Sequence, residues 1–65
     1  MRNFQLLAGA TLYLMSRHAQ DGSPRLAGTI ARHLEQLGTH PHAGELVRQW
    51  AAELVTGWRE RAVRR

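Results

Sequence analysis

Two clusters of turn-forming residues divide this chain into three segments, each long enough for one helix. In the first cluster, Asp21-Gly22-Ser23-Pro24, the serine suits a helix N-cap and the proline suits the first helical position. In the second cluster, residues 38–44, Gly38 suits the left-handed position after a helix, and Pro41 prevents the preceding helix from continuing. The expected helices cover about residues 3–20, 24–37 and 44–61.

The fold class predicted from these segments is all-α. No segment alternates apolar and polar residues as a strand does, and no compact β-hairpin dipeptide lies between apolar segments. A chain of 65 residues has room for one domain, covering residues 1–65, and buries only ~60% of its unfolded surface. Without cysteine, no disulfide adds stability. We therefore expect a small three-helix bundle that homodimerisation completes.

Helical periodicity predicts which residues form the core. The second and third segments each have one apolar face at helical spacing. The third pattern fails at Arg61 and Arg64, so the packed part of that helix is expected to end near Trp58. The predicted core residues are Phe4, Leu7, Leu14, Met15, Leu26, Ile30, Leu34, Leu37, Val47, Trp50, Leu54 and Trp58.

The first segment is apolar nearly all the way round and has only a narrow polar strip. Two neighbouring helices with one apolar face each cannot cover such a helix, and a large uncovered apolar patch usually marks a partner. The leading hypothesis is a non-enzymatic protein–protein interaction module that forms a homodimer or binds another helical protein. The residues predicted for self-association are Leu6, Ala10, Tyr13 and Arg17.

The same segment raises the question of a membrane anchor. Its apolar run, residues 4–15, is shorter than the ~20 residues that a bilayer requires. One positive charge precedes the run, and no cleavage site of small residues follows it, so a signal peptide is not expected either. The absence of cysteine fits a reducing cytoplasm. We expect a cytoplasmic protein of bacterial type with no membrane contact.

A basic C-terminal end, residues 59–65, supports an alternative hypothesis, which is nucleic-acid binding. Its four arginines are placed to contact phosphates, in a nucleoid-associated or regulatory protein. The other basic residues are scattered, and Glu45 at the front of the third helix does not suit the reading of base edges. Nucleic acid is therefore the less favoured partner. The residues assigned to this contact are Arg59, Arg61, Arg64 and Arg65.

Catalytic and metal sites are not expected. His40 and His42 are two possible metal ligands, where three or four are needed. Ser16 and His18 point ~200° apart on a helix, so these residues and Asp21 do not form a catalytic triad. His33 lies on the rim of an apolar face and is expected to be packed and hydrogen-bonded. The sequence thus predicts no enzymatic activity, no cofactor and no metal.

Overall fold

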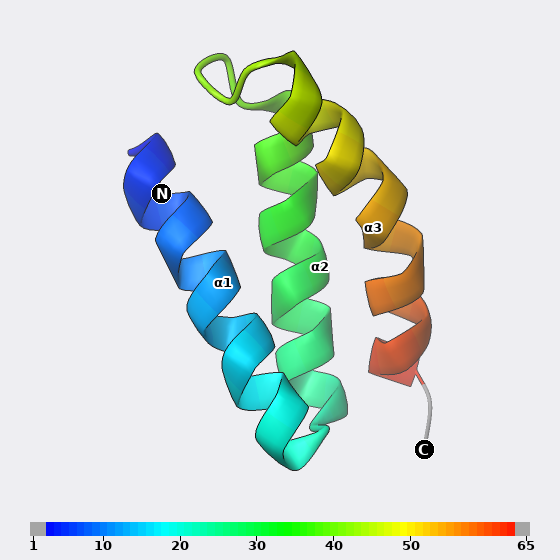
Figure 1. The fold of residues 1–65 in the computed structure, drawn as a ribbon. Helices are drawn as coiled ribbons and strands as arrows, with labels where there is room; N and C mark the ends of the chain where they lie inside the picture. The colour runs from blue at the N-terminus through cyan, green and yellow to red at the C-terminus, as the bar shows by residue number, and fades with distance from the viewer. Residues whose placement is uncertain (1–2, 64–65) are drawn as a thin grey trace.

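A computed structural model describes residues 3–63, which form three helices and no strand (Figure 1). These are α1 (Phe4–Asp21), α2 (Pro24–Thr39) and α3 (Glu45–Val63). The predicted all-α, three-helix fold is confirmed. Each helix begins within one residue of its predicted start and runs one or two residues beyond its predicted end.

The helix ends follow from local hydrogen bonds. The Asn3 side chain accepts from the backbone N–H groups of Gln5 and Leu6, at 2.8 and 3.2 Å, and so caps α1. Gly22, with φ of 65°, ends α1 in the left-handed conformation that glycine adopts without strain. Ser23 accepts from the backbone N–H of Leu26 at 3.4 Å, which confirms its predicted role as the N-cap of α2.

The predicted role of Gly38 is wrong. Gly38 lies inside α2, which continues to Thr39 and ends before His40 and Pro41. A Cβ atom built on Gly38 would lie 3.9 Å from the backbone carbonyl oxygen of Arg48, so the small residue sits where α2 passes close to α3. The left-handed glycine in this connection is Gly44, with φ of 81°, directly before α3.

α2 is the central helix of the fold. It packs against both α1 and α3 and runs antiparallel to each of them, whereas the backbones of α1 and α3 do not approach each other (Figure 1). One side of α2 is therefore flanked by α1 and α3, whose backbones do not meet over it. Side chains link these helices near the end of α1, where the His18 and Trp58 rings meet edge to face with centroids 4.9 Å apart.

The core is built mainly from α2. Leu7 and Ile30 are its largest fully buried side chains. Of the other predicted core residues, Leu34 and Leu37 are buried, and six are partly buried: Phe4, Leu14, Leu26, Met15, Val47 and Trp58. The prediction is wrong for Trp50 and Leu54, which are 54% and 48% exposed. α2 covers only part of the apolar half of α3, and α1 lies too far away to cover the rest.

The packed part of α3 also extends beyond its predicted end at Trp58. A Cβ atom built on Gly28 of α2 would lie 3.7 Å from the Cβ of Ala62, so the two helices remain in close contact there. The expected obstacle, Arg61, turns its guanidinium over the Trp58 ring at 4.6 Å from the ring centroid. The prediction that packing stops near Trp58 is therefore wrong.

Candidate interaction surface

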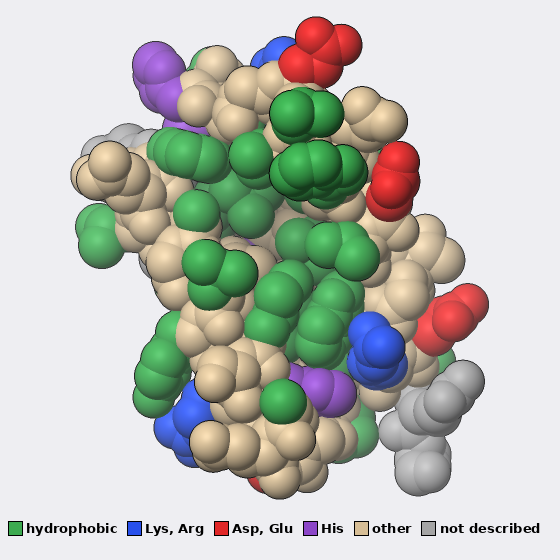
Figure 2. Space-filling view, viewed as in Figure 1, with side chains coloured by type: hydrophobic (Ala, Val, Ile, Leu, Met, Phe, Trp, Pro, Cys, Tyr) green, Lys and Arg blue, Asp and Glu red, His purple; other side chains and the backbone are tan. Residues whose placement is uncertain are grey.

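An apolar groove runs between α1 and α3, with α2 as its floor. Its volume is about 250 Å³. Figure 2 shows apolar side chains gathered on this face, between the two flanking helices. Among residues 3–63, no charged side chain lines the groove. The lining residues are Ala8, Thr11, Leu12, Met15, Leu34, Leu37, Val47, Trp50, Ala51 and Leu54.

Helical spacing brings the walls of the groove together. Ala8, Leu12 and Met15 are separated by four and three residues, so they share one side of α1. Thr11, which is buried beside them, donates its hydroxyl hydrogen to the backbone carbonyl oxygen of Leu7 at 2.7 Å. Because this polar group is satisfied within α1, the groove remains apolar in character.

The rims of the groove carry large apolar side chains that face solvent. On the α1 side Leu12 is 68% exposed. On the α3 side Leu46, which is 59% exposed, precedes Trp50 and Leu54 at intervals of four residues. These three α3 residues therefore form a continuous exposed row on one side of that helix. We call this row, Leu46-Trp50-Leu54, the α3 ridge.

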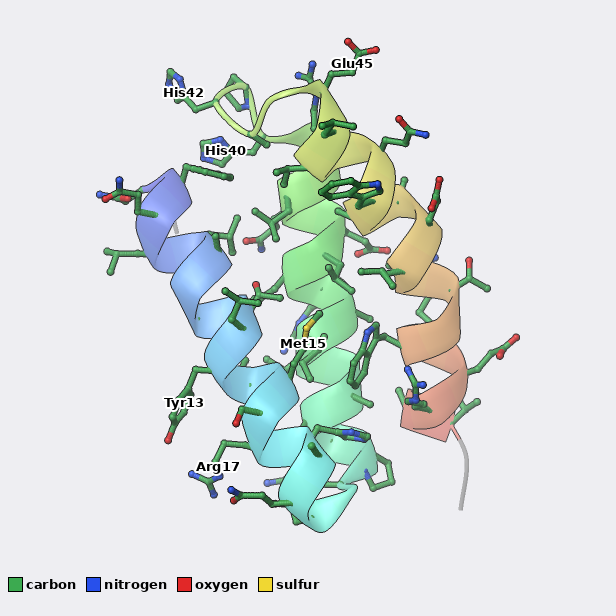
Figure 3. The ribbon with its side chains drawn as sticks, viewed as in Figure 1. Tyr13, Met15, Arg17, His40, His42 and Glu45 are labelled. Carbon is green, nitrogen blue, oxygen red and sulfur yellow. The ribbon has the colours of Figure 1, made fainter. Side chains whose placement is uncertain are left out.

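The residues predicted for self-association lie on the other side of α1. Leu6 and Tyr13 are exposed, at 63% and 60%, and Ala10 is half-buried. Arg17 donates through Nη1 to the Tyr13 hydroxyl oxygen at 3.2 Å, and this hydrogen bond raises the pKa of Arg17. Figure 3 shows Tyr13 and Arg17 pointing away from the groove. The structure brings these two residues together, but on the outer face of α1.

Two of the arginines assigned to nucleic acid make contacts within the chain. Arg59 forms an ion pair with Glu35 of α2, and Arg61 lies over Trp58. Arg64 and Arg65 lie outside the described residues. Both described arginines remain exposed, so the contact with Glu35 is a surface ion pair, which typically contributes only ~0–1 kcal/mol.

The histidines are dispersed over the fold. The backbone N–H of His42 donates to Nδ1 of His40 at 3.1 Å, so that nitrogen is already engaged as an acceptor. Within residues 3–63, no group of three or more His, Cys, Asp or Glu side chains is placed to hold a metal ion.

His33 is half-buried on α2, as predicted for a packed residue. Its buried Nδ1 atom has no hydrogen-bond partner among the described residues, so the expected hydrogen bond is wrong at this nitrogen. Burial, with a contribution from the neighbouring Arg32, lowers the pKa of His33. The lowered pKa means that protonation of this ring opposes folding.

The groove is the part of the surface that sequence reasoning missed. The third segment did indicate such a surface. Its apolar residues form an arc over about half of the helix circumference, and this arc includes all three residues of the α3 ridge. An arc of that width exceeds what one neighbouring helix covers. The sequence pattern does not specify which part of this arc α2 covers, and it therefore predicts core positions for Trp50 and Leu54.

Along the described part of the chain, no helix combines the length and the apolar character needed to cross a membrane.

Comparisons with known proteins add no relative from which a role could be transferred. No known protein family, curated protein or solved structure matches the chain.

Proposed function

We propose that this protein is a non-enzymatic protein–protein interaction module that binds an apolar helix face in its groove. The observation that carries the proposal is the solvent exposure of Leu12, Trp50 and Leu54 around an uncharged groove. Helices with apolar stripes are stable when those stripes are covered by another element. A further helix laid between α1 and α3 would cover all three side chains.

The energetics support a contact of useful strength. Burial of apolar surface contributes about 25 cal/mol for each Å², so covering the exposed half of a leucine or tryptophan contributes on the order of 1–2 kcal/mol. The rim residues together therefore offer several kcal/mol to a partner. The groove walls are helical and packed on α2, so little ordering is needed before binding.

Nucleic-acid binding has less support. Arg59 and Arg61, two of the four arginines assigned to it, engage Glu35 and Trp58 instead of forming a free basic patch. Phosphate binding would have to compete with these contacts. A partner that binds the apolar groove, in contrast, would not have to displace any contact of this kind among the described residues.

A synthetic helical peptide with leucines on one face and glutamates on the other tests the proposal. We expect a fluorescein-labelled form, at nanomolar concentration, to show a saturable rise in anisotropy as low-micromolar protein is added. Leu54→Lys should weaken this binding at least about tenfold, because it places a charge on the apolar rim. The added positive charge would by itself favour the acidic peptide, so a loss reports the apolar contact.

Leu6→Lys is the matched control for this titration. It makes the same change at another exposed leucine of the fold, but on the outer face of α1. We expect it to bind the peptide at least as tightly as the wild type does. Equal binding by all three proteins would contradict the proposed function, and so would binding by none of them at concentrations where the wild type is monomeric.

A further inference from the structure

We infer that the partner in the groove is a second copy of this chain, and that two copies pack groove face to groove face about a two-fold axis. The inference rests on the proposed function and deepens it by naming the partner. In this arrangement the α3 ridge of each copy inserts into the groove of the other copy. Three observations support it: the area of the face, its shape and its lack of charge.

The exposed area fits a two-fold contact. Leucine and tryptophan side chains offer on the order of 100–250 Å² each, so the exposed parts of Leu12 and the α3 ridge add up to about 400 Å². A two-fold contact buries the same patch on both copies, which gives about 1,000 Å² in total when the groove walls are included. Specific interfaces begin at about this size. The outer face of α1, with Leu6 and Tyr13, offers roughly half as much.

The shape of the face suits pairing with a second copy of itself. A two-fold interface requires a projection and a matching hollow on the same surface, because each copy supplies both. The α3 ridge is the projection, and its Trp50 and Leu54 form one wall of the groove, in which Ala8 and Ala51 are the smallest lining residues. A volume of about 250 Å³ is large enough for inserted side chains, since a cavity of ~150 Å³ already admits a benzene ring.

The distribution of charge also favours the groove over the outer face of α1. No charged side chain of the described residues lines the groove, so two copies meet there without burying an ion from its lining. On the outer face, Arg17 stands beside Tyr13, and covering its guanidinium would carry a desolvation cost. Each copy carries a net charge of +4, so the copies repel each other at long range. Added salt screens that repulsion.

Sedimentation equilibrium on untagged wild type, Leu54→Lys and Leu6→Lys tests the inference. We expect the wild type and Leu6→Lys to be dimers at tens of micromolar, and Leu54→Lys to be monomeric. The dissociation constant of the Leu54→Lys dimer should be at least about a hundredfold higher than that of the wild type, because a two-fold contact contains the new charge twice. Raising NaCl to about 0.5 M should tighten the wild-type dimer, whereas binding to nucleic acid weakens with salt.

Circular dichroism of each variant shows whether the helices remain. If Leu54→Lys unfolds, Leu12→Lys on the opposite rim replaces it, and the same loss of the dimer is expected. A wild type that stays monomeric up to several hundred micromolar would overturn the inference. So would a dimer that Leu6→Lys dissociates and Leu54→Lys does not, which would place the contact on the outer face of α1.

The peptide titration separates these outcomes from failure of the proposed function. A monomeric wild type that binds the leucine–glutamate peptide, and loses it in Leu54→Lys, would leave the interaction module standing with a different partner. A monomeric wild type that binds no peptide would overturn both. Dimerisation that weakens with salt would also contradict the inference, because it would indicate a contact between opposite charges.

Discussion

Leu7→Ala should leave most of the protein unfolded at 25 °C. Leu7 is fully buried and lies in the core cluster with Ile30, Leu34, Leu37 and Ala51. Truncating a buried leucine costs about 2–5 kcal/mol, from lost burial and from the cavity left behind. A core in a chain of this size rarely supplies more than ~3–5 kcal/mol, so this single change removes most or all of the stability.

Leu6→Ala is the control for this prediction, since it makes the same change one residue earlier in α1. Leu6 is exposed, and its truncation should change the free energy of unfolding by no more than about 0.5 kcal/mol. Urea unfolding followed by circular dichroism, at one fixed protein concentration, measures both variants. Similar unfolding midpoints for the two variants would contradict the placement of Leu7 in the core.

Ala8→Leu should weaken self-association while the fold is retained. Ala8 is half-buried and lines the groove, so a leucine there occupies the space that the partner's α3 ridge requires. The added side chain packs against apolar groove walls and introduces no charge or polar group. We expect the dissociation constant of the dimer to rise at least about tenfold, with the stability of the monomer unchanged or increased.

Ala10→Leu is the matched control for Ala8→Leu. Ala10 is also a half-buried alanine of α1, but it belongs to the outer face with Leu6 and Tyr13. Sedimentation equilibrium should give the wild-type dissociation constant for this variant. Loss of the dimer in Ala10→Leu together with its retention in Ala8→Leu would show that the outer face, and not the groove, is the contact.

Local sequence signals predicted the helices well because each signal acts within a few residues. Ser23 and Pro24 start α2 as expected, since a cap depends on one side chain and the next turn. The apolar character of the first segment also predicted correctly that α1 would stay partly uncovered. Leu6, Leu12 and Tyr13 are all exposed.

Long-range packing is what the sequence did not determine. An apolar arc on a helix shows how much surface favours burial, but its coverage depends on where the neighbouring helices lie. Because α1 and α3 flank α2 without approaching each other, Trp50 and Leu54 line a groove instead of filling a core. The close contacts between α2 and α3 at Gly38 and Gly28 also depend on where the helices lie, and no local pattern indicates them.

A dilution series of ¹H–¹⁵N NMR spectra on the untagged wild type tests most directly whether a second copy covers the groove. We expect the amide resonances that shift with concentration to belong to the groove face, including Ala8, Leu12 and Leu54. The resonances of Leu6 and Tyr13 should stay fixed. Shifts confined to the outer face of α1, or spectra that do not change between low and high micromolar concentrations, would contradict the account.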